Sequence, residues 1–150
     1  MQDIYLHNTD LSFNIKKLDN SIQRKILSIF DNREFADCSL QNMWITDYLF
    51  HMEIQGKTTF QKDIEAEFSI NRATASKMLS LMEEKQLISR ANSDKDGRLK
   101  ALTLMPRGRE LQGLCYFIRT EIEKQLTQSL SDEEVRVFKE LIARAMGNMG

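Results

Sequence analysis

The chain has 150 residues, enough for one domain that buries about 70% of the surface its unfolded form exposes. Its formal net charge is −1, and it has no run of about 18 apolar residues, which excludes a membrane-spanning helix. It has two isolated cysteines, and its N-terminal stretch lacks the basic and apolar regions of a signal peptide. These features favour a cytoplasmic protein without disulfides.

The first predicted helix spans residues 10–30, where apolar residues recur along one face: Leu11, Ile15, Leu18, Ile22, Ile26 and Ile29. A second helix is predicted over 40–52, with Trp44, Tyr48 and His51 at i, i+4 and i+7 on one face. Such an aromatic row is typical of packing, but it can also form the wall of a small-molecule pocket. Spacing alone leaves both interpretations open.

Two further helices, joined by a three-residue turn, follow. Thr58 and Gln61 match the capping-box pattern and predict a short helix over 58–68. The next helix is predicted to run from the N-cap Asn71 to about Lys85. This arrangement is a helix-turn-helix, whose second helix docks in the major groove of DNA.

The second of these helices has two contrasting faces. Ala75, Leu79 and Met82 share one face, which is predicted to be buried. The opposite face is small, polar and positively charged, as a groove-reading face should be, and consists of Ala73, Ser76, Lys77 and Ser80.

A β-hairpin is predicted after this helix, with arms at 88–91 and 99–104 and a turn at 93–97. It carries four basic residues: Arg90, Lys95, Arg98 and Lys100. From 69 to 109 the chain has nine Lys/Arg and four acidic residues, for a charge of +5, so the remainder carries −6. Positive charge is therefore concentrated on the helix and hairpin, the distribution that a phosphate-binding surface needs.

The C-terminal part predicts two more helices. One runs from Pro106 to about Ser129, and a capping box of Ser131 and Glu134 opens the last one. The inward residues of that last helix are Val135, Phe138, Leu141, Ile142 and Ala145. Together with the first helix, these helices carry more apolar surface than a monomer of this size can cover, so we expect a partner subunit.

From about Thr58 to Leu111 the chain resembles the MarR-type (multiple antibiotic resistance regulator) winged helix-turn-helix repressors. The residues that carry the resemblance are Thr74 to Lys77, Met82 to Arg90, Asp96-Gly97-Arg98, Leu102-Thr103-Leu104 and Arg107-Gly108. Two positions depart from the family pattern. Gln86 stands where the family usually has Gly, at a helix C′ position where a left-handed backbone costs roughly 1 kcal/mol without Gly. Met105 replaces the usual Thr, and Pro106 at N1 partly compensates for the lost cap.

The resemblance implies a mainly α fold with a small β-wing: a winged helix-turn-helix domain with N- and C-terminal dimerisation helices. The chain would be a single domain, 1–150, with scaffold and dimerisation helices at 10–55 and 106–148 and the DNA-binding unit at 56–105. In this family two chains interlock as a homodimer that binds double-stranded DNA. The two-fold symmetry predicts a pseudo-palindromic operator with half-sites about one helical turn apart. The implied function is a transcriptional regulator, a repressor released by a small ligand.

Four residues in the first turns of the recognition helix are placed to reach bases or phosphates: Arg72, Thr74, Ser76 and Lys77. On the hairpin, Arg90 adds positive charge, and Arg98 and Lys95 are expected to project toward the minor groove. The family pattern implies that Asp96 orients the wing by holding Arg98 or a neighbouring basic side chain. The alternative for the four helix residues is an exposed helix face that contacts no DNA. The alternative for Asp96 is a solvated carboxylate in a turn.

The resemblance also implies an effector, because family members often bind small aromatic or anionic molecules and others sense oxidants through a cysteine. Trp44, Tyr48 and His51 are the candidate pocket wall. Cys38 and Cys115 have no obvious cationic neighbour in sequence, which favours inert buried thiols. No metal or other cofactor is expected, since the chain has two His and no ligand cluster at metal spacing.

Two other classes compete with a DNA-binding regulator. A winged-helix module that grips another protein would lack the salt dependence of DNA binding, for which about eight phosphate contacts predict a log–log slope near −7. An enzyme is disfavoured because the chain offers neither a nucleophile–base–acid set nor a phosphate-cradling Gly-rich loop.

Overall fold

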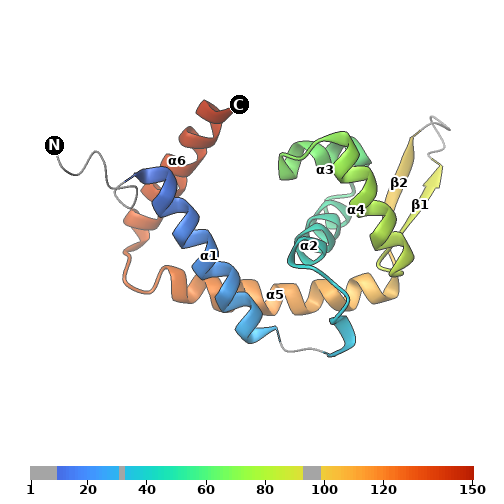
Figure 1. The fold of residues 1–150 in the computed structure, drawn as a ribbon, viewed down its shortest axis with the longest axis horizontal. Helices are drawn as coiled ribbons and strands as arrows, with labels where there is room; N and C mark the ends of the chain where they lie inside the picture. Colours follow the sequence, from blue (N-terminus) through green and yellow to red (C-terminus); the bar gives the residue numbers. More distant parts are fainter. Residues whose placement is uncertain (1–9, 31–32, 93–98) are drawn as a thin grey trace. The chain divides into compact units, whose positions relative to one another are not determined.

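The structure is a computed structural model that describes residues 10–30, 33–92 and 99–150. Its elements in chain order are α1 (Leu11–Ile29), η3 (Arg33–Phe35, a 3-10 helix), α2 (Leu40–Ile54), α3 (Gln61–Phe68), α4 (Arg72–Glu84), β1 (Ile88–Asn92), β2 (Lys100–Leu104), α5 (Pro106–Leu126) and α6 (Asp132–Met149) (Figure 1). The chain divides into two compact units. One contains α1, α5 from Ile118 onward and α6; the other extends from η3 to Phe117.

The η3-to-Phe117 unit has a winged helix-turn-helix arrangement, so the predicted fold class is confirmed. The strands β1 and β2 pair antiparallel, with Ile88 opposite Leu104 and Asn92 opposite Lys100. The core collects apolar side chains from each of its main elements, all less than 7% exposed: Met43, Ile45, Leu49, Ile64, Ala75, Leu79, Met82, Leu87, Ile88, Leu102, Leu104 and Leu111.

The start of α3 differs from the prediction. The predicted capping box of Thr58 and Gln61 is wrong, because α3 begins at Gln61 and its N-cap is Phe60, whose N–H donates to Asp63 Oδ2 at 2.8 Å. The preceding backbone is extended because Thr59 pairs with β2, and its carbonyl accepts the N–H of Leu102 at 2.9 Å. This third chain segment at the wing shifts the helix start past Thr58.

In the other unit, α1 and α6 leave most of their apolar side chains exposed. Ile26 is the buried residue of α1, whereas Leu11 and Ile15 are 73% and 54% exposed. The α6 helix has no buried residue, although its capping box forms as predicted, with Ser131 Oγ accepting the N–H of Glu134 at 3.1 Å. None of the described helices has the length and apolarity needed to cross a bilayer.

Candidate nucleic-acid interface

The recognition helix α4 is amphipathic in the predicted sense. Its inner face is completely buried, with Ala75, Leu79 and Met82 at 0% exposure. Asn71 caps the helix, its side-chain Oδ1 accepting the N–H of Thr74 at 2.8 Å. This bond satisfies one of the amide groups that a helix N-terminus leaves unpaired and orders the first turn. Five residues of the first two turns are exposed: Arg72, Ala73, Thr74, Ser76 and Lys77.

Arg90 on β1 reaches back to α4. Its Nη2 donates to Ser80 Oγ at 2.9 Å and lies 3.4 Å from Glu83 Oε1, and its side chain is 20% exposed. Ser80, which we predicted on the open face, is therefore half-buried under this contact. Arg90 attaches the wing to the recognition helix, and its proposed contact with DNA stays a prediction.

The wing strands are described up to Asn92 and from Leu99 onward. Lys100 is exposed at the beginning of β2. The tip, with Lys95, Asp96 and Arg98, lies outside the described residues, so their predicted roles at the minor groove stay predictions.

The C-terminal end of α4 is closed by a glycine-like turn. Gln86 has φ +61°, the left-handed conformation expected for this position. Its N–H donates to the Glu83 carbonyl, and the N–H of Leu87 donates to the Met82 carbonyl, both at 3.0 Å. These two bonds form the pattern of a Schellman motif, and Met82 and Leu87, the positions that such a motif usually pairs, are both fully buried.

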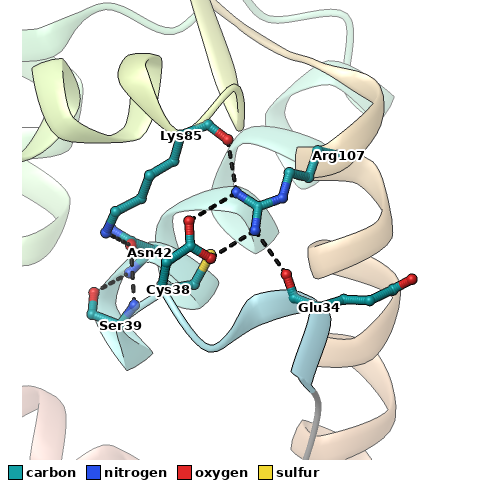
Figure 2. Close-up of polar contacts among 7 residues, drawn as sticks. Glu34, Cys38, Ser39, Asn42, Lys85 and Arg107 are labelled. Carbon is teal, nitrogen blue, oxygen red and sulfur yellow. Dashed lines mark hydrogen bonds and ion pairs between the residues drawn. The ribbon is translucent and has the colours of Figure 1, made fainter.

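Arg107 links three segments around this helix end (Figure 2). Its Nη1 donates to the Lys85 carbonyl at 2.8 Å, and its Nη2 donates to the Glu34 carbonyl at 2.8 Å. Both nitrogens also pair with the Asp37 carboxylate, at 3.2 and 2.6 Å. The guanidinium carbon lies 5.4 Å from the centre of the buried Phe35 ring, a cation–π distance. Sequence reasoning counted Arg107 as one charge of a basic surface and as part of the Arg107-Gly108 motif, but it missed this ion pair because Asp37 lies 70 residues away.

The ion pair also affects neighbouring groups. The hydrogen bonds from Arg107 hold the pKa of the Asp37 carboxyl below its usual value. Burial and the nearby Asp37 charge raise the pKa of the Cys38 thiol, which keeps it protonated at neutral pH.

A second contact joins the end of α4 to α2. Lys85 donates from Nζ to Asn42 Oδ1 at 3.2 Å, and Asn42 caps α2 together with Ser39.

Gly108 allows α5 to approach the end of this turn. A Cβ atom built on Gly108 would lie 2.1 Å from the Leu87 carbonyl oxygen, closer than real Cβ contacts permit. The N–H of Met105 donates to the same carbonyl at 3.0 Å. The Arg107-Gly108 motif therefore has a local physical reason: one residue bonds the recognition helix end and the next makes room for it.

The aromatic row of α2 is half-buried. Tyr48 packs edge-on against Phe68 with ring centres 5.9 Å apart, and His51 Nε2 lies 3.5 Å from Asp47 Oδ1. These contacts fit the packing interpretation, and the pocket-wall interpretation of Trp44, Tyr48 and His51 stays a prediction.

Across the described residues, His, Cys, Asp and Glu form no group of three or more that could hold a metal ion.

The exposed helix face, its buried underside and the hairpin behind it define a winged helix-turn-helix protein. A family model described as the MarR family matches residues 46–99. The chain is 30% identical to the transcription regulator MarR from Oenococcus oeni PSU-1, with a TM-score of 0.76 over 92% of this chain and 99% of that one. The chain belongs to the MarR family.

Two other relatives extend the comparison. An uncharacterised HTH-type transcriptional regulator, YxaD of Bacillus subtilis (strain 168), is 29% identical over 83 residues, which span 55% of this chain and 58% of that protein. The match therefore covers less than two thirds of that relative. MepR of S. aureus, solved as a DNA complex, has a TM-score of 0.76 at 23% identity, over 93% of this chain and 98% of that one, and supports the fold.

Proposed function

We propose that this protein is a homodimeric transcription regulator that binds double-stranded DNA at a pseudo-palindromic operator. The observation that carries the proposal is the first half of α4: a capped, exposed turn with Arg72 and Lys77, backed by a fully buried face and flanked by the wing. Small and positively charged side chains on an exposed helix are the groups that reach base edges and phosphates. Such a regulator acts in the cytoplasm and requires no catalytic chemistry.

The proposed division of labour follows the positions of the side chains. Thr74 and Ser76 would contact base edges, Arg72 and Lys77 would contact bases or phosphates, and Arg98 would enter the minor groove. In a symmetric dimer each contact occurs twice, and a dimer that makes about eight phosphate contacts in all should show a log–log salt slope near −7.

The test is to measure binding of the purified protein to the DNA upstream of its own coding sequence across a salt series. Arg98→Ala should weaken binding, and Lys139→Ala, at an exposed position of α6, should not. A steep negative slope supports DNA as the partner. A flat salt dependence, with equal affinities for the two variants, would favour the alternative, a winged-helix module that grips a protein.

A ligand response forms the second part of the proposal. A small aromatic or anionic effector would bind beside Trp44, Tyr48 and His51 and favour a spacing of the two recognition helices that no longer matches successive grooves. Such a ligand can shift the equilibrium only by its differential affinity for the two states. Repeating the binding assay with phenolic ligands and with peroxide tests this part separately, and unchanged affinity for the DNA with every compound would contradict it.

A further inference from the structure

The four hydrogen bonds of Arg107 use the four N–H groups on Nη1 and Nη2. The side chain is 29% exposed, and its charge is paired with Asp37. Arg107 is therefore poorly placed to contact a phosphate, although it adds one to the positive charge of this part of the chain. Its bonds instead connect the N-terminus of α5, the segment before α2 and the end of the recognition helix.

The bond to the Lys85 carbonyl is placed where a helix needs a cation. The last carbonyls of a helix lack intrahelical partners and carry the negative end of the helix dipole. Arg107 satisfies the C-cap carbonyl of α4, while Lys85 itself holds Asn42 at the start of α2. The end of the recognition helix is thus attached on two sides to α2 and α5.

A small tilt of α4 about its C-terminal end produces a larger displacement at its N-terminal end. A helix of 13 residues is roughly 20 Å long, so a tilt of about 3° moves its far end by about 1 Å. The far end of α4 carries Arg72 and Thr74. Because hydrogen bonds to base edges need donor–acceptor distances near 3 Å, such a displacement would weaken several of them at once.

We propose that Arg107 is a positioning residue for DNA recognition, acting with Asp37 to fix the C-terminal end of α4 without touching DNA itself. This inference rests on the proposed DNA-binding function. It differs from a role as one more basic contact, because the anionic partner is as necessary as the cation.

Asp37→Asn and Arg107→Gln separate the two roles because they change the net charge in opposite directions. The probes are the upstream DNA and a random-sequence duplex of equal length, each measured across a salt series. If Arg107 acts by positioning, both variants weaken binding to the upstream DNA, by about tenfold, with less effect on the random duplex and an unchanged salt slope. The double variant should be no weaker than the more affected single variant, because both act through one pair.

Lys77→Ala is the matched control for a direct contact. It should weaken binding to both duplexes and reduce the slope by about 2, because the dimer loses two phosphate contacts. Arg107→Lys should recover part of the affinity, since an ammonium can pair with Asp37 but cannot make all four bonds.

Stronger or unchanged binding by Asp37→Asn would overturn the inference, as would a slope reduction by Arg107→Gln like that of Lys77→Ala. Asp37 is half exposed, so Asp37→Asn decides the question even where Arg107→Gln does not fold, as judged by circular dichroism. If the native protein binds DNA in a salt-dependent manner and Asp37→Asn binds with unchanged affinity, the inference is wrong and the proposed function stands. Absence of salt-dependent binding by the native protein would sink the proposed function and the inference with it.

Discussion

Gln86 holds a left-handed backbone conformation, φ +61°, that glycine adopts without the steric cost imposed by a Cβ atom. Gln86→Gly should therefore raise the free energy of unfolding by about 0.5–1 kcal/mol, in spite of the added freedom of the unfolded chain. Urea unfolding at a fixed protein concentration measures the change. Glu84→Gly, in the last helical residue of α4, should lower stability by a similar amount, and a loss of stability in both variants would contradict the prediction.

Two glycines of α5 should respond oppositely to the same substitution. Gly108→Ala forces a Cβ atom against the Leu87 carbonyl, which belongs to backbone fixed by the turn, and should destabilise the protein by about 1–3 kcal/mol. Gly113→Ala meets no atom within 4 Å and should stabilise the helix by about 0.5–1 kcal/mol. Thermal unfolding of the two variants checks the difference in sign. An equal response would mean that α5 does not approach Leu87 as described.

The Asp37–Arg107 pair predicts a pH dependence. Because Arg107 lowers the pKa of Asp37 in the folded protein, this contribution to stability is fully present above the ordinary value of 3.8 and is lost as the pH falls through the folded-state pKa. Asp37 is half exposed, so the contribution should be about 1 kcal/mol or less. Unfolding of the native protein and Asp37→Asn should differ at pH 7 and converge below about pH 3.8. A difference in stability that stays constant as the pH falls well below 3.8 would argue against the ion pair as its source.

At the residue scale, hydrophobic spacing predicted the positions of side chains better than the counting of charges did. Spacing located Ala75, Leu79 and Met82 on the buried face of the recognition helix, because a 3.6-residue period is encoded locally. Counting could not separate Lys77, which is exposed, from Arg90 and Arg107, which bond within the chain. Their partners are set by tertiary contacts, which no local pattern records.

At the scale of elements, local sequence signals predicted the helix-turn-helix and the wing. They failed at the start of α3, where the predicted capping box does not form. Asn71 and Ser131 were recognisable as caps because their bonds reach only three residues ahead. The Thr58 box matched the same kind of pattern, but pairing between Thr59 and Leu102 extends the backbone there. A contact across 43 positions therefore overrode a local preference.

The cap of α4 carries a prediction that separates stability from recognition. Asn71→Ala should destabilise the protein by about 1 kcal/mol and fray the turn that holds Arg72 and Thr74, so it should also weaken DNA binding. Ser131→Ala removes an equivalent bond at α6 and should lower stability by a similar amount. It should not lower the affinity for DNA when the protein concentration is high enough to keep the protein dimeric. The two variants are compared by urea unfolding and by fluorescence anisotropy with labelled upstream DNA. Equal DNA affinity for both would show that order in the first turn of α4 does not matter.

For the whole molecule, the dominant feature is the apolar surface that α1 and α6 leave exposed among the described residues. The α6 helix exposes large apolar side chains at helical spacing: Phe138, Leu141, Ile142 and Met146. Exposure of a continuous apolar face is unfavourable in water, at about 25 cal/mol for each Å², and a second copy of the chain can bury it without any further partner. The sequence predicted the stripe and a partner subunit as its cover, but it could not identify the residues of the partner that pack there, because periodicity reports only that a face is apolar.

Leu141→Arg should therefore dissociate the proposed dimer. Leu141 is 53% exposed in the single chain, so the substitution leaves the subunit's own packing largely intact. In the dimer it would desolvate a charge without a partner, which costs several kcal/mol per subunit. Sedimentation velocity should detect mainly monomer at micromolar concentration, and binding to the upstream DNA should fall together with the dimer fraction. Lys139→Ala, on the same helix, should remain dimeric. A dimeric Leu141→Arg protein that binds DNA normally would exclude this face of α6 from the subunit interface.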